Sequence, residues 1–282
     1  MEALATLWSS TQFTIQKLPY YLRLKNLGNR FLDPFYRVEI ENAYFQVKTI
    51  TTAVELAQVL KLRFNVFYGE FAPSKRIKTF LKYDVDLHDF ICDHLIVKDK
   101  TSDQVVACYR LLHSDQIHRV DHYYSEAEFD LAPFLALEGK KLELGRACVH
   151  KDYRSGQVIA LLWKGLCDYA RQSEARYLFG CSSVGQKELS HLPQILEELR
   201  QGQAFISDYM VKSKSPFKLE PRQDNSDSSV RRSLNSLMHM YLMAGAKFSS
   251  DVAFDEDMNC VDLFTVVDFS KLPPSFERRF AC

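Results

Sequence analysis

The segment Leu142–Val149 constrains the fold more than any other part of the chain, because it is an apolar strand that contains a carboxylate, a glycine and a guanidinium. Glu143 and Arg146 are three residues apart, so a regular strand would point them to opposite faces of the sheet. Gly145 lies between them, and a glycine inside a strand often marks a bulge that re-aims one side chain. We therefore predict a strand irregularity at or next to Gly145; the alternative is an ordinary strand end with a surface ion pair.

A basic loop follows this strand and opens a helix at Ser155-Gly156. The unsatisfied N–H groups and the dipole of a helix start can hold an anion such as a phosphate. Lys151 and Arg154 add positive charge at the same point. A glycine before a helix is more often only a turn, so this segment indicates phosphate binding chiefly in combination with the preceding strand.

The remaining sequence predicts further strands and helices. Thr52 and Glu55 form a capping-box pattern at a helix start, and the turn at 99–103 predicts a hairpin. Apolar spacing predicts strands at 44–50, 94–98, 105–112, 142–149, 177–183 and 261–269, and helices at about 52–67, 155–173, 186–199 and 230–244. This order predicts a mixed α/β or α+β fold with helices on both faces of the sheet.

We expect three regions in the 282-residue chain. They are a basic and aromatic N-terminal extension at 1–40, a core at 41–200, and a C-terminal extension at 201–282 that completes the same domain. Residues 213–229 are polar and contain two prolines, so they predict a flexible break.

Charge and cysteine content indicate the compartment and exclude one class of partner. The chain has 36 Lys and Arg against 36 Asp and Glu, and this balance argues against nucleic acid as a partner. No apolar run is long enough for a membrane-spanning helix, and the seven cysteines include no C-x-x-C pair, so we expect a cytoplasmic protein with reduced thiols. Five basic residues lie among seven aromatics in 1–37, which suggests peripheral contact with the inner face of the membrane. The alternative is that this segment packs on the domain.

The strand, the basic glycine loop and the helix together resemble the GNAT superfamily of N-acyltransferases. In that superfamily a bulge splays the fourth strand, and the next loop cradles a pantetheine phosphate. The resemblance implies a mixed, mostly antiparallel sheet with a splayed, bulged central strand. The loop Arg154-Ser-Gly156-Gln-Val-Ile-Ala160 departs from the superfamily pattern Gln/Arg-x-x-Gly-x-Gly/Ala, which argues against tight binding of the coenzyme A pyrophosphate.

Further motifs make the resemblance more specific. The acyl-homoserine-lactone synthases have, in the same order and spacing, motifs similar to Arg63-Phe-Asn-Val-Phe67, Asp86-Leu-His-Asp89, Tyr109-Arg110-Leu-Leu112 and Glu143-Leu-Gly-Arg146. The ornithine–acyl carrier protein N-acyltransferases, which make lyso-ornithine lipid, are similar also at Cys92-Asp-His-Leu-Ile-Val97, Leu161-Leu-Trp-Lys-Gly165-Leu, 241–247 and 261–268. The resemblance covers roughly residues 44–280.

This resemblance implies an amide-forming N-acyltransferase of lipid biosynthesis. The enzyme would move a fatty acyl group, with or without a 3-hydroxyl, from acyl carrier protein to the α-amino group of an amino acid. Ornithine is the first choice of acceptor and glycine the next. No cofactor or metal is expected, because the acyl carrier protein thioester is the donor. The competing hypotheses are a homoserine-lactone-type signal synthase and a non-enzymatic module that binds carrier protein or membrane.

Roles for single residues follow from the chemistry and from the resemblance. The attacking amine must lose a proton, so a carboxylate is needed, and we assign Glu143 as the base. Backbone N–H groups around Gly145–Cys148 are the expected donors to the thioester oxygen. Cys148 has no neighbouring base and is not expected to be a nucleophile. The resemblance places Arg146 with Glu143 in the catalytic set. It also groups Arg146 with Arg63, Asp86, Asp89 and Arg110 in a polar cluster on the acceptor side, where Phe67 is the expected pocket wall. On the phosphopantetheine side it places Lys151, Arg154, Ser155 and Gly156.

Each of these groups has a simpler alternative. The arginines and aspartates would also suit an internal salt-bridge network that orders a loop, and Phe67 would suit a plain core position. Lys151, Arg154, Lys164 and Arg171 are expected to face the acidic surface of the carrier protein, unless they are only solvated.

Overall fold

The computed structural model describes residues 32–71, 82–186, 188–217, 235–256 and 258–280. Within these ranges the chain divides into two compact units. Unit 1 contains residues 32–121, 144–174 and Phe280, and unit 2 contains residues 122–143 and 175–279. The division at 40 and 200 stays a prediction. The suggested membrane segment and most of the suggested flexible break lie outside the described residues.

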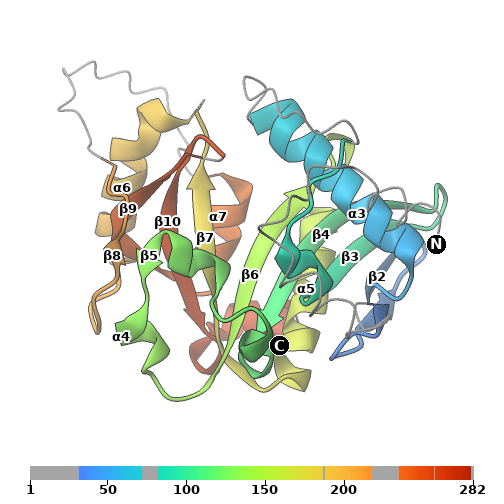
Figure 1. The fold of residues 1–282 in the computed structure, drawn as a ribbon, viewed down its shortest axis with the longest axis horizontal. Helices are drawn as coiled ribbons and strands as arrows, with labels where there is room; N and C mark the ends of the chain where they lie inside the picture. Colours follow the sequence, from blue (N-terminus) through green and yellow to red (C-terminus); the bar gives the residue numbers. More distant parts are fainter. Residues whose placement is uncertain (1–31, 72–81, 187, 218–234, 257, 281–282) are drawn as a thin grey trace, which may run out of the picture. The chain divides into compact units, whose positions relative to one another are not determined.

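Unit 1 is built on strands in the order β1-β2-β3-β4-β6 (Figure 1). Their bounds are Glu39–Glu41, Phe45–Thr49, Asp93–Asp99, Gln104–His113 and Lys140–Val149. Only the part of β6 from Leu144 onward belongs to unit 1. Successive strands from β1 to β4 pair antiparallel. The predicted hairpin is therefore confirmed as β3 and β4.

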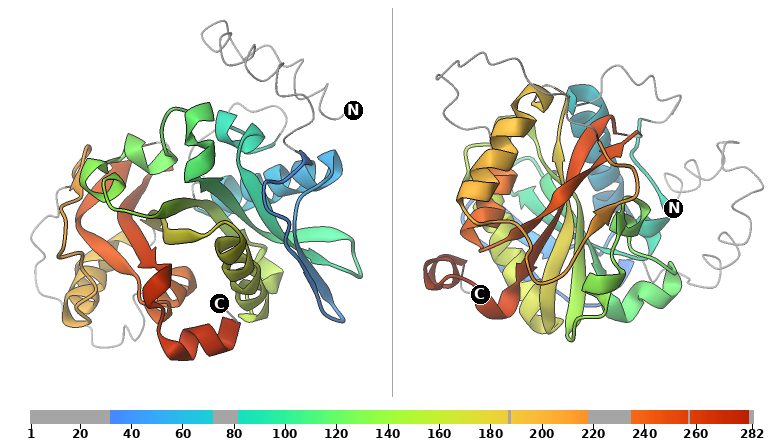
Figure 2. Two further views of the ribbon diagram at one scale, coloured as in Figure 1. Left: turned by 90° about the horizontal axis from the view of Figure 1, so that it is seen from below. Right: turned by 90° about the vertical axis from the view of Figure 1, so that its left-hand side faces the viewer.

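Helices cover both faces of the unit 1 sheet (Figure 2). On one face α3 (Ala53–Val66) packs against Ile96 and its neighbours. On the other face α5 (Gln157–Gln172) brings Gly165 against Leu95. Because Leu95 and Ile96 are consecutive in β3, their side chains point to opposite faces. The prediction of helices on both faces is confirmed here.

The capping box predicted at the start of α3 is present. The Thr52 side chain accepts a hydrogen bond from the Glu55 N–H, and the Glu55 carboxylate accepts one from the Thr52 N–H. A single π-helical turn, η3 (Phe67–Phe71), extends the helix.

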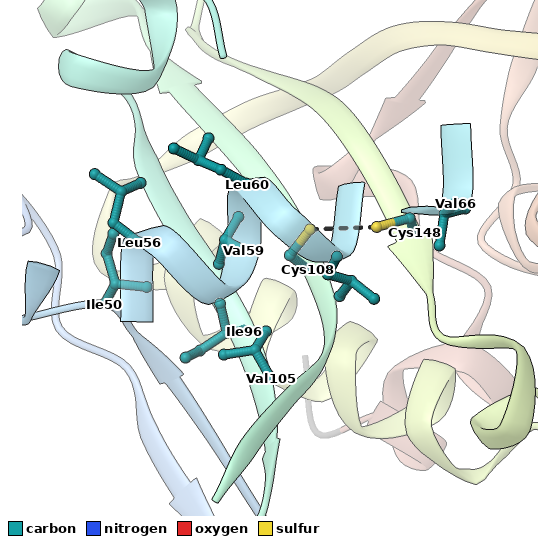
Figure 3. Close-up of a cluster of buried hydrophobic side chains, with 10 residues drawn as sticks. Ile50, Leu56, Val59, Leu60, Val66, Ile96, Val105, Cys108 and Cys148 are labelled. Carbon is teal, nitrogen blue, oxygen red and sulfur yellow. Dashed lines mark hydrogen bonds between the residues drawn. The ribbon is translucent and has the colours of Figure 1, made fainter. Parts of the chain in front are cut away.

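The core beneath α3 is formed by aliphatic residues and two cysteines (Figure 3). Leu56, Val59 and Leu60 are buried on the helix. Cys108 of β4 and Cys148 of β6 approach each other, with their sulfur atoms 3.5 Å apart. Cys148 is therefore part of this core.

Unit 2 is built on strands in the order β6-β7-β10-β9, with the first four residues of β6 at one end (Figure 1). β6 and β7 (Ala175–Val184) are parallel. β10 (Cys260–Asp268) pairs antiparallel with β7 and with β9 (Lys247–Asp255). The mixed, mostly antiparallel sheet that the resemblance implied is thus confirmed.

Short elements complete both units. The remaining helices are α4 (Ala132–Leu135), α6 (Leu192–Gln201), α7 (Ser236–Met243) and α8 (Pro274–Phe280). A two-stranded ladder joins β5 (Phe129–Asp130) to β8 (Lys212–Ser213). The 3-10 turns are η4 (Leu87–Phe90), η5 (Ser114–Arg119), η6 (Tyr124–Ala127), η7 (Lys151–Tyr153), η8 (Leu189–His191) and η9 (Phe269–Lys271).

An aromatic cluster fills one side of the unit 2 sheet. Phe134 lies 4.9 Å from Phe179 and 5.2 Å from Phe264, measured between ring centroids. Tyr123 lies 5.0 Å from Phe179. The loop and the short helix between residues 122 and 143 are therefore packed on β7 and β10.

Two further expectations concern membranes and thiols. No helix among the described residues is both long and apolar enough to cross a membrane. Cys92, Cys108, Cys148, Cys181 and Cys260 are not disulfide-bonded. Cys167 is disulfide-bonded, so the expectation that the thiols are all reduced is wrong at this position.

Candidate active site

The predicted strand irregularity is present in β6, one residue beyond Gly145. Arg146 has φ +52°, which is a left-handed conformation that residues other than glycine seldom adopt. The parallel register between β6 and β7 extends from Lys140 to Glu143. The strand therefore pairs with β7 up to the predicted base, and its backbone turns out of the regular conformation three residues later.

Glu143 is buried in unit 2 and is held by fixed donors. Its Oε2 accepts a hydrogen bond from the Tyr124 N–H at 2.9 Å. Its Oε1 accepts two more, from the N–H and from the Oγ of Ser125, both at 2.7 Å. These three hydrogen bonds orient the Glu143 carboxyl group and join the start of η6 to β6. Sequence reasoning missed Ser125.

The predicted acceptor-side residues come together in unit 1 as an ion-pair network. Arg63 Nη1 is 2.5 Å from Asp89 Oδ1. Arg110 Nη1 is 2.7 Å from Asp86 Oδ1 and 3.1 Å from Asp89 Oδ1. Arg146 Nη2 is 3.3 Å from Asp86 Oδ2. The five polar residues that the resemblance grouped are therefore linked in one network.

Sequence reasoning missed one member of this network, Asp84. Its Oδ2 accepts from Arg63 Nε at 2.7 Å, and it lies 3.3 Å from Arg146 Nε. The available signal was the spacing of Asp84, Asp86 and Asp89 in a short run before β3. With Asp84 included, three guanidinium groups face three carboxylates, and the formal charge of the network is zero.

Burial makes these pairings strong. Burial alone would raise the pKa of Asp89, but the charges of Arg63 and Arg110 lower this pKa far below its usual value. Burial lowers the pKa of His94 to about 4, so His94 is neutral at pH 7 and does not disturb the charge balance. The most accessible members are Asp86 and Arg146, whose side chains are 29% and 13% exposed. Arg63 and Asp89 are thus fully buried in the network, whereas Asp86 and Arg146 lie at its accessible edge.

Phe67 is the first residue after α3 and is half-buried against the core beneath that helix. This packing agrees with a core position, and the role of Phe67 as a pocket wall stays a prediction.

The predicted phosphopantetheine loop is exposed. Lys151, Arg154, Ser155 and Gly156 all lie at the surface, and α5 begins directly after them at Gln157. Gly156 has φ +93°, a conformation that glycine adopts without strain. Arg154 Nε donates to the Val149 carbonyl at 3.0 Å, which fastens the loop to the end of β6. A helix start is thus presented to solvent with basic side chains around it.

The cysteine in β6 is unsuited to nucleophilic attack. A hydrogen bond with Cys108 and burial both raise the pKa of Cys148 well above its usual value. The thiolate is the reactive form of cysteine, so Cys148 stays a neutral core thiol.

Comparison with known protein families matches residues 62–164 to the acetyltransferase (GNAT) domain. That range holds the end of α3, the ion-pair network, β6 and the first half of α5. This part of the chain is therefore of GNAT type.

Whole-chain comparisons narrow the class to a family. The chain is 30% identical to the L-ornithine N(alpha)-acyltransferase of Brucella abortus (strain 2308), over 78% of this chain and 82% of that protein. It is 28% identical to the enzyme of the same name from Rhodobacter capsulatus, over 79% of this chain and 90% of that protein. The chain belongs to the L-ornithine N(alpha)-acyltransferase family.

Among solved structures, similarity extends to FeeM, an N-acyl amino acid synthase from uncultured soil microbes. The TM-score is 0.47 at 8% sequence identity, with 86% of this chain and 99% of that chain covered.

Proposed function

We propose that the protein transfers a fatty acyl group from acyl carrier protein to the α-amino group of ornithine, in the biosynthesis of an aminolipid. The observation that carries the proposal is the position of Glu143, a buried carboxylate held by three hydrogen bonds beside the irregular part of β6. Membership of the ornithine acyltransferase family supports the acceptor.

The reaction is direct aminolysis of a thioester. The α-ammonium first loses one proton, and its nitrogen then attacks the carbonyl carbon. The C–N bond forms, the C–S bond breaks, and the second proton leaves with the pantetheine sulfur as a thiol. Glu143 is the proposed acceptor of the first proton. No acyl-enzyme is needed, in agreement with the neutral, buried Cys148.

Arg146 is the proposed partner of the acceptor's carboxylate. It lies at an accessible edge of the ion-pair network, and a guanidinium group matches a carboxylate in geometry and charge. Arg63, Asp89 and Arg110 hold this edge in place, since all three are buried in the same network.

The exposed loop before α5 supports carrier protein as the donor. A helix start can hold the single phosphate of a pantetheine arm. Lys164 and Arg171 are also exposed on α5, so basic groups extend along the helix from Lys151 and Arg154. A carrier protein with an acidic surface would be attracted by these groups, mainly through a faster association that salt weakens.

The base assignment is tested with Glu143→Gln. We expect turnover to fall roughly 10²- to 10⁴-fold, the usual contribution of a general base. Glu138→Gln is the matched control, because Glu138 is an exposed carboxylate in the same unit. Transfer to ornithine is followed by mass spectrometry, and circular dichroism checks that both variants are folded. A folded Glu143→Gln protein with full activity at neutral pH would contradict the assignment.

The donor is tested by comparing acyl carrier protein with acyl coenzyme A at equal concentrations and several salt concentrations. The carrier-dependent kcat/KM is expected to be the larger and to fall with salt. Lys164→Glu should lower it, whereas Lys61→Glu, an exposed change on α3 at the opposite face of the unit 1 sheet, should not. Equal use of coenzyme A without a salt effect would exclude carrier protein as the preferred donor.

A further inference from the structure

The histidine in the string Cys92-Asp-His-Leu-Ile-Val97 lies next to the ion-pair network of unit 1. His94 is a residue of β3 and is 1% exposed. Its neighbour Leu95 faces α5, so His94 faces the side of the sheet that α3 covers. In the β3–β4 ladder His94 is opposite Arg110, and opposed residues share a face. The imidazole therefore lies beside the network, although the proposed reaction gives it no role.

His94 and Arg110 hold Asp89 at its two ends. His94 Nε2 is 3.0 Å from the backbone carbonyl oxygen of Asp89. A carbonyl oxygen only accepts hydrogen bonds, so Nε2 carries the hydrogen and donates it. Arg110 Nη1 is 3.1 Å from Asp89 Oδ1. One pair of opposed residues in the ladder thus fixes both the main chain and the side chain of this aspartate.

Asp89 in turn fixes the turn η4 and the residue that caps it, Asp86. The Asp86 N–H donates to Asp89 Oδ2 at 2.8 Å, and the Asp86 side chain accepts from the His88 N–H at 2.9 Å. These two hydrogen bonds form a capping box that closes the turn on itself. The hydrogen bond to the Asp89 carbonyl therefore also determines where Asp86 lies.

Asp86 is the carboxylate at the accessible edge of the network. Both of its oxygens lie 2.7 Å from Arg110 Nη1, and Oδ2 lies 3.3 Å from Arg146 Nη2. Asp84 contacts the same guanidinium group from the buried side, at Arg146 Nε. The direction of the Arg146 guanidinium group, the proposed partner of the acceptor's carboxylate, is therefore set in part by the position of η4.

The second nitrogen of His94 makes this residue costly for the fold. With the hydrogen on Nε2, Nδ1 is an acceptor, and it is buried with no hydrogen-bond partner among the described residues. An unsatisfied buried acceptor is destabilising, and such departures from local rules are expected at functional sites. An apolar residue would avoid this cost, but it could not hold the Asp89 carbonyl.

We infer that His94 is a positioning residue for acceptor binding, because its hydrogen bond to η4 keeps Arg146 directed at the acceptor's carboxylate. The contacts run from His94 through Asp89 to Asp86 and then to Arg146. This inference rests on the proposed function. Burial lowers the pKa of His94 to about 4, so the imidazole holds the turn at pH 7 without adding a positive charge to the network.

The test compares His94→Gln with His94→Met. The two side chains have similar lengths, and only glutamine has an N–H donor as far from the main chain as Nε2. We expect His94→Met to raise the KM for ornithine roughly 5- to 10-fold, the factor to which one lost hydrogen bond corresponds. The kcat and the KM for the acyl donor should stay nearly unchanged, and His94→Gln should restore the KM for ornithine. His118→Met, a change at an exposed histidine of the same unit, is the matched control.

A double-mutant cycle shows whether His94 acts through Asp86. Residues of one hydrogen-bond network have non-additive effects, so His94→Met should raise the KM by a much smaller factor when Asp86→Asn is already present. A role in stability alone would lower the fraction of active enzyme, and with it the apparent kcat, but would leave the KM unchanged. Equal factors in both backgrounds, equal KM values for His94→Gln and His94→Met, or a loss confined to kcat would overturn the inference.

Urea unfolding followed by circular dichroism shows whether the variants are folded. If His94→Met is not folded, His94→Asn takes its place in the comparison, because the shorter amide does not reach the Asp89 carbonyl. If neither variant folds, His94 serves the stability of unit 1 and the inference is wrong.

The outcomes also separate this inference from the proposed function. If the wild type transfers an acyl group to ornithine and His94→Met has the same KM, only the inference fails. If the wild type acylates no amino acid, the proposed function fails, and the nuclear magnetic resonance signal of the Arg146 Nε–H group decides whether His94 holds the network. That signal should move in His94→Met and stay in place in His94→Gln; an unchanged signal in both variants would overturn the positioning role.

Discussion

Replacing Asp89 by asparagine should destabilise unit 1 more than any surface change in the same unit. Asp89 is fully buried and accepts hydrogen bonds from Arg63, from Arg110 and from the Asp86 N–H. The neutral amide would leave three guanidinium groups facing two carboxylates. Removing one partner from a buried ion pair costs about 3–5 kcal/mol, because the remaining charge is left uncompensated.

The assay is urea unfolding followed by far-ultraviolet circular dichroism at pH 7. With an m value of about 2–3 kcal/mol/M, the predicted cost shifts the midpoint by about 1–2 M. Asp103→Asn is the matched control, since Asp103 also pairs with a basic residue, Lys98, but its side chain is 80% exposed. Exposed ion pairs contribute about 0–1 kcal/mol, so the control should unfold close to the wild type.

The pH dependence gives the prediction a second readout. The folded-state pKa of Asp89 lies below its unfolded value of about 3.9. Its contribution to stability is therefore complete above that value and is lost as the pH falls below it. The difference between wild type and Asp89→Asn should be largest at pH 7 and should shrink at pH 3. A loss below about 1 kcal/mol at pH 7, or a difference that does not change with pH, would refute this account of the network.

Two other predictions concern packing and titration. Gly165→Ala should lower the free energy of unfolding by about 1–2 kcal/mol in the same urea assay, because the new Cβ would lie 2.6 Å from Val47 Cγ1 and overpacking outweighs the gain in helix propensity. Asp93 is buried, and burial raises its pKa to about 7. Its protonation therefore favours the folded state at low pH, and this contribution should fall as the pH rises from about 4 to about 7. Asp93→Asn should remove that dependence, and an unchanged pH profile of stability would contradict it.

Local patterns predicted most elements of the fold but not all of them. The capping box at Thr52, the hairpin of β3 and β4 and the irregularity beside Gly145 each depend on a few neighbouring residues, and all three are present. β9 was missed, because its sequence KFSSDVAFD has no regular alternation of apolar and polar residues. That strand is defined by its pairing with β10, which no local pattern expresses.

The candidate site, too, could be predicted from the sequence only in part. Resemblance and residue type brought Arg63, Asp89 and Arg110 into one group, and the structure places them in contact. Neither source indicates which carboxylates balance which arginines, so Asp84 was missed. The approach of Glu128 to Asp262 is also invisible in the sequence, since 134 residues separate them and only the packing of the turn before β5 on β10 brings them together.

The interleaving of the two units along the chain has a consequence for synthesis on the ribosome. Once residue 174 has emerged from the ribosome, all of unit 1 except its last residues has been synthesised. Residues 122–143 have emerged by then as well, but they belong to unit 2. Those residues must wait for 175–279 before they can pack. Domains generally fold as units during synthesis, and incomplete ones expose apolar surface. The aromatic side chains around Phe134 thus remain without their partners until β7 and β10 have been made, and Glu128 cannot contact Asp262 before residue 262 has emerged.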